Sequence, residues 1–225
     1  GSTDLQITGD VMARANGASA IGAQSDGADG GGDITISLLD GSSVIGGLGG
    51  AGITIIGGNN NTVVVDGVLG TLDNLNGVAV ATGPGSASGN DTVSNFGTAV
   101  GSVMLGAGDN VFRNEEGAVF YTGSLLELDI ERSGSDAVGT FYNFGFVSPG
   151  GPGETAETVV QGNFVQGATG VFLTEYDLSR SGEGAQIDRL TITGSASIDG
   201  SIDIALSNPG YVMPGEYSDV LFSAP

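Results

Sequence analysis

Short runs of alternating apolar and polar residues, interrupted by glycine, extend along most of the chain. In the clearest run, 126–131, three aliphatic residues share one face of a predicted strand and three carboxylates share the other. No run longer than about ten residues has the 3.6-residue period of a helix, and the frequent glycines would break most helices. We therefore predict a nearly all-β chain. Further predicted strands are 34–36, 53–56, 62–65, 190–193 and 201–206.

One short pattern occurs three times in the middle of the chain. In each copy a large apolar residue stands two positions before an asparagine, and a glycine follows two or three positions after it. The asparagines, Asn95, Asn114 and Asn143, recur at intervals of 19 and 29 residues, which is typical of stacked repeats. We interpret the three residues as a core residue, a turn residue that holds the register and a glycine with positive φ. The glycines are Gly97, Gly117 and Gly145.

Many short strands are compatible with a sandwich, a barrel or a solenoid, and the repeat favours the solenoid. In a parallel β-solenoid, successive coils stack about 4.8 Å apart and their inward residues form continuous columns. Coils of roughly 20 to 30 residues would give about eight to eleven coils, and a rod on the order of 40 to 50 Å long. The sequence therefore predicts an all-β parallel β-helix.

The charge of the chain excludes several kinds of function. The net charge is −21, from 26 acidic residues against five arginines, without lysine or histidine. Nucleic acids and anionic lipids require clustered cations, so neither is an expected partner. The absence of histidine and cysteine excludes the usual catalytic triads, disulfides and structural zinc. The arginines are Arg14, Arg113, Arg132, Arg180 and Arg189.

Residues 89–110, which begin GNDTVSNFG, resemble repeats in the passenger domains of type V autotransporters. Three later segments are similar in content and order to the end of such passengers, and the resemblance covers about 61–225. They are 144–151, 160–166 and 188–196. The resemblance implies a right-handed parallel β-helix with a C-terminal autochaperone-like section, matched best by 188–206. We divide the chain into Gly-rich N-terminal coils (1–60), regular coils (61–153) and this C-terminal section (154–225).

The same resemblance implies a non-enzymatic adhesin or self-association stalk, displayed on or released from a Gram-negative cell. The implied partners are a host-cell or extracellular-matrix surface, the same protein on another cell, and an outer-membrane β-barrel that we expect beyond Pro225. Gly1 and Ser2 resemble a cloning remnant, so we expect an excised piece of a longer protein. No catalytic, cofactor-binding or metal-binding residue is assigned.

Two alternatives rest on acidic residues. Asp91 and Asp109 stand in partial matches to the nonapeptides of calcium-binding β-rolls, but neither is followed by a second copy, so a turn role is favoured. Glu127, Asp129 and Glu131 would lie on one strand face with neighbours roughly 7 Å apart, a separation found in glycoside hydrolases. Since Arg132 is the only cation nearby, we favour a solvated outer face over an enzyme acting on polysaccharides.

The densest aromatic group could bind sugar rings on a flank of the solenoid or fill its interior, and the repeat favours the interior. Asp188 and Arg189 are expected to form a surface or cap ion pair of little energetic value. The aromatic residues are Tyr121, Phe141, Tyr142, Phe144 and Phe146.

Overall fold

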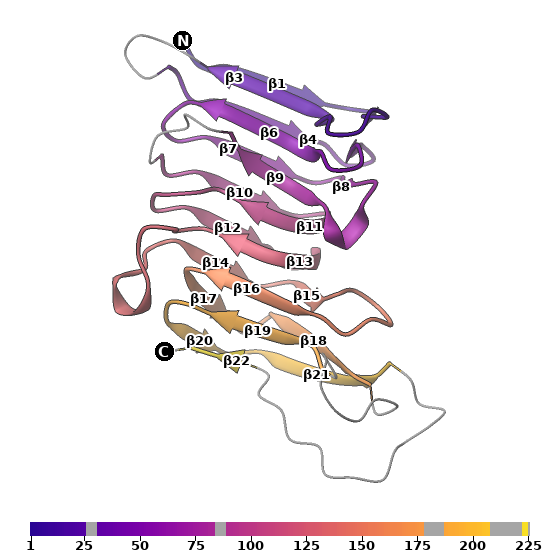
Figure 1. Ribbon diagram of the computed structural model, residues 1–225, viewed down its shortest axis with the longest axis vertical. Helices are drawn as coiled ribbons and strands as arrows, with labels where there is room; N and C mark the ends of the chain where they lie inside the picture. The colour runs from indigo at the N-terminus through magenta and orange to yellow at the C-terminus, as the bar shows by residue number, and fades with distance from the viewer. Residues whose placement is uncertain (26–30, 84–88, 178–186, 208–221, 225) are drawn as a thin grey trace.

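The chain forms a right-handed parallel β-helix, seen in the computed structural model as strands stacked from the N-terminus at one end of a rod to the C-terminus at the other (Figure 1). The structure describes residues 1–25, 31–83, 89–177, 187–207 and 222–224. All the pairings between its named strands are parallel. The predicted all-β solenoid is therefore confirmed.

One face of the rod is an eight-stranded sheet to which successive coils contribute neighbouring strands. Its order is β1 (Thr3–Ile7), β4 (Ile34–Leu38), β7 (Thr62–Val65), β10 (Thr92–Asn95), β12 (Val111–Asn114), β14 (Thr140–Asn143), β17 (Asn163–Gln166) and β20 (Ala196–Ile198).

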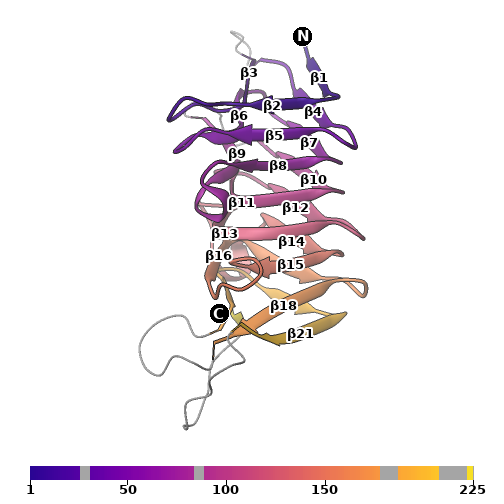
Figure 2. The same cartoon turned by 90° about the vertical axis from the view of Figure 1, so that its right-hand side faces the viewer.

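A second face continues the coils around the next corner (Figure 2). Its strands are β2 (Asp10–Met12), β5 (Ser43–Gly46), β8 (Val68–Thr71), β11 (Thr98–Met104), β13 (Val119–Glu127), β15 (Phe146–Pro149), β18 (Val171–Tyr176) and β21 (Ser201–Leu206). The same 14-stranded sheet bends into the third face because β11 and β13 are long enough to pair with both.

The third face completes the coil. Its remaining strands are β3 (Ile21–Ser25), β6 (Ala51–Gly57), β9 (Val78–Thr82), β16 (Glu157–Gln161), β19 (Arg189–Ile192) and β22 (Phe222–Ser223). Two short 3-10 helices, η1 (Asn74–Asn76) and η2 (Gly134–Asp136), lie in connections between strands. The predicted strands at 34–36, 53–56, 62–65, 190–193 and 201–206 correspond to β4, β6, β7, β19 and β21.

The core is a column of apolar side chains inside the coils. Alternation along each strand of the eight-stranded sheet points every second residue inward, so Val93, Phe112, Phe141 and Phe164 lie in register and are almost fully buried. The rings of Phe112 and Phe141 are 5.4 Å apart, and those of Phe141 and Phe164 are 5.2 Å apart. The expected core column is thus confirmed.

The glycines of the repeat act differently from the prediction. Gly117 alone among the three has a positive φ, 83°. At Gly97 an added Cβ would overlap the carbonyl oxygen of Gly67, and at Gly145 it would overlap that of Glu115. Two of the three glycines are therefore required by the close approach of the neighbouring coil's backbone.

Candidate functional site: polar ladders, corners and flanks

The asparagines of the repeat form a buried ladder where strands of the eight-stranded sheet end. Asn95 Nδ2 donates to Asn114 Oδ1 at 2.8 Å, and Asn114 Nδ2 donates to Asn143 Oδ1 at 2.9 Å. Asn143 Nδ2 continues the ladder to Gln166 Oε1 at 3.2 Å. The three asparagines have no exposed surface. Their predicted place at the turn and their role in holding register agree with this geometry.

Each amide of the ladder also binds the backbone of the next coil. Asn95, Asn114 and Asn143 donate from Nδ2 to carbonyl oxygens at the starts of β13, β15 and β18, at 2.9, 3.0 and 3.3 Å. Gln166, which the repeat pattern did not include, donates to the carbonyl oxygens of Asp199 and Ser201. The ladder therefore fixes both the strand and the turn after it, and it is satisfied chiefly by other protein groups.

A second ladder runs along the corner before the same sheet. Asn61 Oδ1, Asp91 Oδ1 and Asn110 Oδ1 each accept from a backbone N–H of the preceding coil, at 2.9, 2.8 and 2.9 Å. Asp91 is 4% exposed, and burial raises the pKa of its carboxyl even though hydrogen bonds from Asn61 oppose this rise. Asp91 therefore has a structural role, because it binds neighbouring coils together at this corner.

The calcium alternative gains no support from the two aspartates. Asp109 is exposed and pairs with Arg132 at 3.2 Å, away from the buried position of Asp91. Among the described residues, no group of three or more acidic, histidine or cysteine side chains is arranged to hold a metal ion. The geometry favours the turn role for both residues.

The three carboxylates of 126–131 do not share a strand face. Strand β13 ends at Glu127, Ile130 is 55% exposed, and Asp129 is 1% exposed. Asp129 accepts hydrogen bonds from the backbone N–H groups of Glu131 and Val138, at 3.2 and 3.1 Å. The predicted strand is therefore wrong beyond Glu127, and so is the predicted solvated face at Asp129. Burial raises the pKa of the Glu127 carboxyl.

The aromatic group divides between the core and the flanks. Phe141 is fully buried, as expected, but Tyr121, Tyr142, Phe144 and Phe146 are only partly buried. The last four are consistent with alternation, since Tyr142 follows inward Phe141 and precedes inward Asn143. The interior prediction is correct for Phe141 and wrong for the other four.

Two of the outer aromatic residues pack with an arginine. The rings of Tyr142 and Phe144 are nearly parallel, 6.3 Å apart, and the Arg113 guanidinium carbon lies 5.2 and 5.0 Å from their centres. Arg113 Nε donates to Glu115 Oε1 at 2.6 Å, which fixes the guanidinium. A hollow of about 390 Å³ is formed beside this cluster. Its lining residues are Arg113, Glu115, Glu116, Phe144, Ala168 and Thr169.

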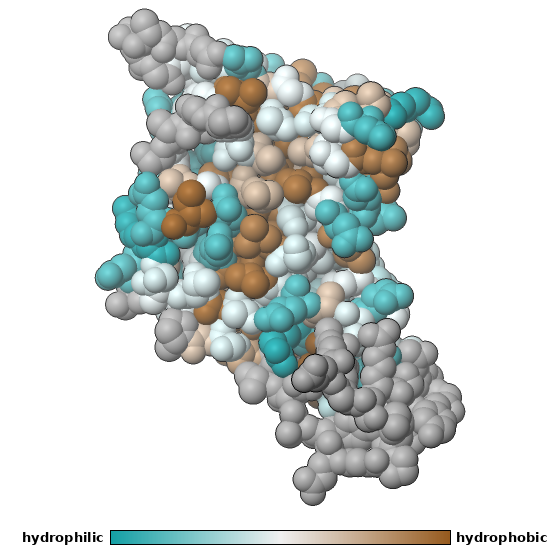
Figure 3. All heavy atoms as spheres, viewed as in Figure 1, coloured by the Kyte–Doolittle hydropathy of each residue, from teal (hydrophilic) through white to brown (hydrophobic). Residues whose placement is uncertain are grey.

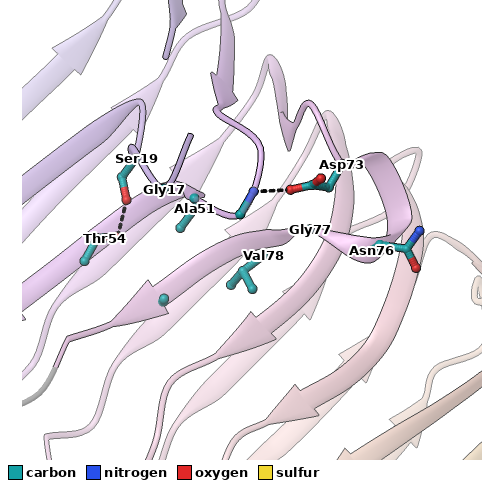
Figure 4. Close-up of a pocket in the computed structure, with 11 residues that line it drawn as sticks. Gly17, Ser19, Ala51, Thr54, Asp73, Asn76, Gly77 and Val78 are labelled. Atoms are coloured by element: carbon teal, nitrogen blue, oxygen red, sulfur yellow. Dashed lines mark hydrogen bonds between the residues drawn. The ribbon is translucent and has the colours of Figure 1, made fainter. Parts of the chain in front are cut away.

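A second hollow, of about 320 Å³, lies where glycine-rich loops pass over β6 and β9 (Figure 4). The hydroxyls of Ser19 and Thr54 are 2.6 Å apart, and Asp73 accepts a hydrogen bond from the Gly49 N–H. Asp73 is the one charged residue among those that line it. The hollow offers hydrogen-bonding groups but no pair of carboxylates for acid–base chemistry.

Asp188 is buried, which corrects the predicted surface ion pair. Its Oδ1 accepts from the Ala156 N–H at 2.8 Å, and its Oδ2 accepts from the Glu175 N–H at 2.8 Å. The side chain has no exposed surface, and its burial raises the pKa to about 7, a rise that the charge of Glu175 increases. Asp188 therefore joins three segments near the C-terminal end of the rod.

These features define a class of protein: a parallel β-solenoid with polar ladders inside its corners and small hollows on its surface. Comparisons with protein-family models, curated proteins and solved structures give no match. In the part of the chain that the structure describes, no helix has the length and apolar character needed to cross a bilayer.

Proposed function

We propose that this chain is a stalk segment of a surface-displayed adhesin or self-associating protein, and that it acts through contacts along its flanks without catalysis. The observation that carries the proposal is the distribution of charge. The nine strands from β3 to β11 contain no charged residue. The five described acidic residues of 21–104 lie between strands.

The outward side chains of these strands form flat, uncharged columns. Thr35, Thr62 and Thr92 lie side by side on successive coils of the eight-stranded sheet. Ser37, Val64 and Ser94 form a parallel column two residues along. Figure 3 shows a corresponding pattern on the third face, where apolar and intermediate residues run along the middle and many hydrophilic residues gather at the edges.

A neutral flank in a chain of charge −21 supports an adhesive role, because close approach of a partner does not require burial of uncompensated carboxylates. Repetition from coil to coil offers many weak contacts of the same kind, which add up when both surfaces are extended. The resemblance to autotransporter passengers supports display outside a Gram-negative cell, with an autochaperone-like section at 154–225.

The proposal is tested by coating beads with the protein and measuring both bead clumping and attachment to host cells and matrix proteins. We expect at least one of these activities, and we expect Ser37→Glu, which places a charge between Gln6 and Val64 in the neutral flank, to reduce it several-fold. Asn16→Glu, which adds the same charge in an exposed turn, is the matched control. Absence of clumping and attachment together would contradict the proposal. The full reading frame tests display, since we expect an export signal upstream and a barrel downstream.

A further inference from the structure

One corner of the rod carries two phenylalanines that the core does not use. Phe96 and Phe144 each follow a ladder asparagine, and their N–H groups donate to the carbonyl oxygens of Val65 and Asn114 in the preceding coils, both at 2.7 Å. They therefore occupy the same corner position, two coils apart. With one coil every 4.7–4.9 Å, they are separated by about 9.5 Å along the rod.

Phe96 is 50% exposed, and it is the one aromatic residue among the exposed large apolar residues of the described chain. Phe144 is partly buried: its ring packs against the backbone of Gly167, where a Cβ would overlap it, and it contributes to the hollow beside Arg113. The corner thus presents apolar ring surface at two points on one line.

The groups between the rings are polar and fixed in place. Glu115 occupies the corner position of the intervening coil, since its N–H donates to the carbonyl oxygen of Asn95 at 2.9 Å. Its carboxylate holds Arg113, whose guanidinium lies over the Phe144 ring. Thr169 lines the far side of the hollow, with its hydroxyl donating to the Phe144 carbonyl oxygen at 2.8 Å. Hydrogen-bond donors and acceptors therefore surround an aromatic surface.

This combination fits one class of ligand better than others. An anionic ligand is disfavoured, because Arg113 is already paired with Glu115 and Glu116 adds a further negative charge. A wholly apolar ligand would desolvate the Arg113–Glu115 pair and Glu116 and would offer them no hydrogen bonds in return. A neutral sugar has C–H groups that pack on an aromatic ring and hydroxyls that bond to carboxylate, guanidinium and threonine at its rim.

We propose that the corner from Phe96 to Phe144 binds a neutral saccharide, with one sugar ring in the hollow at Phe144 and the chain running along the corner towards Phe96. The two-coil separation is comparable to the length of a disaccharide unit in an extended glycan. This inference rests on the proposed adhesive function, for which it names the class of ligand.

Saturation-transfer-difference NMR on the full chain tests the inference, with cellotetraose and N-acetyllactosamine as neutral probes and sialyllactose as an acidic comparison. We expect transfer to at least one neutral probe and little to sialyllactose. Phe96→Ala should weaken binding of the longer probe several-fold, and Phe144→Leu should reduce binding at least tenfold. Ile130→Ala, which shortens a 55% exposed side chain elsewhere, should leave it unchanged.

Two results would overturn the inference: no transfer to either neutral probe at millimolar concentration, or equal binding by wild type and Phe96→Ala. Phe96 is exposed, so its variant reports on binding even if Phe144→Leu disturbs folding. Cell attachment measured on the same variants separates the two proposals. Attachment without any saccharide binding leaves adhesion standing and removes the saccharide site, whereas saccharide binding without attachment leaves the site standing and removes adhesion.

Discussion

Asn95 lies directly beside Val65 of the preceding coil, and its buried Oδ1 atom accepts no hydrogen bond from any described residue. The asparagine ladder therefore begins with an unsatisfied acceptor, whereas its last amide, on Gln166, finds two carbonyl oxygens. All its side-chain amides donate towards the C-terminal end of the rod, so the ladder has a direction. Val65 is the position at which one further asparagine would extend it.

We predict that Val65→Asn destabilises the protein less than Val63→Asn. Both valines are buried inward residues of β7, so both changes lose similar apolar burial. At position 65 the new amide can donate to Asn95 Oδ1, whereas at position 63 it faces Ile36 and Val93. We expect a difference of about 1–3 kcal/mol in the free energy of unfolding, measured by denaturant titration. Equal destabilisation would contradict the ladder's role.

Asn114→Ala should be strongly destabilising. The change removes the donor to Asn143 and to the Phe146 carbonyl oxygen, and it removes the acceptor for Asn95. Loss of these buried hydrogen bonds should cost about 2–4 kcal/mol in unfolding free energy. Asn76→Ala, at an exposed position, is the control and should stay within about 0.5 kcal/mol of wild type.

Gly97→Ala should cost more than Gly117→Ala, although only Gly117 has a positive φ. At position 97 the new methyl group would overlap the Gly67 carbonyl oxygen and force two coils apart. At position 117 no atom lies within 4 Å, so the cost is the left-handed backbone alone, about 1 kcal/mol. Thermal melts of the two variants would show the order, and the reverse order would exclude close coil approach as the dominant constraint.

Acidification from pH 8 to pH 5 should stabilise the fold. The pKa of Asp188 is raised to about 7 in the folded protein, so the folded state binds more protons than the unfolded state between about pH 4 and pH 7. Stability therefore falls as pH rises through this window, and the effect of Asp188 is at most about 4 kcal/mol. Asp91 and Glu127, whose pKa values are also raised, act in the same direction.

Asp188→Asn distinguishes the effect of Asp188 protonation on stability from the effect of the lower overall negative charge at acidic pH. The variant cannot titrate at position 188, so its melting temperature should rise less between pH 8 and pH 5 than that of wild type. Carbon NMR of the Asp188 carboxyl provides a direct measurement. A midpoint near pH 4 would contradict the raised pKa.

Metal removal should leave stability unchanged. Asp91 Oδ1 is already bonded to the backbone N–H and the side-chain amide of Asn61, and Asp109 pairs with Arg132. We therefore expect the same thermal transition with and without EDTA. A transition that falls on chelation and recovers with added calcium would revive the β-roll alternative.

The repeat was sufficient to predict the core column and the ladder positions, because both depend on spacing along the sequence. The ends of strands were harder to predict. Alternation continues beyond Glu127, but Asp129 turns inward and binds the N–H groups of Glu131 and Val138, which ends the strand. A side chain that binds nearby backbone N–H groups competes with strand pairing for these groups. Such competition depends on local contacts and leaves no periodic pattern in the sequence.

The outer aromatic residues could have been placed from the sequence. Phe141 and Asn143 are inward, and a period of two then places Tyr142 on the flank. Asp188 was not accessible to the same reasoning. Its partners, at Ala156 and Glu175, lie 32 and 13 residues away, and only the stacking of coils brings them together. Likewise, the hollow at Phe144 requires the turn at Gly167, which belongs to another coil.

The unequal steps of the ladder show where the chain can change length. Asn95 and Asn114 are separated by 19 residues and Asn114 and Asn143 by 29, yet both pairs are held by amide hydrogen bonds of nearly equal length. Nineteen residues are therefore enough to close a coil. The longer coil accommodates about ten additional residues, and its connection between strands contains η2. Evolution or an engineer could insert and remove loops there, and so alter the surface of the rod while its interior stays the same.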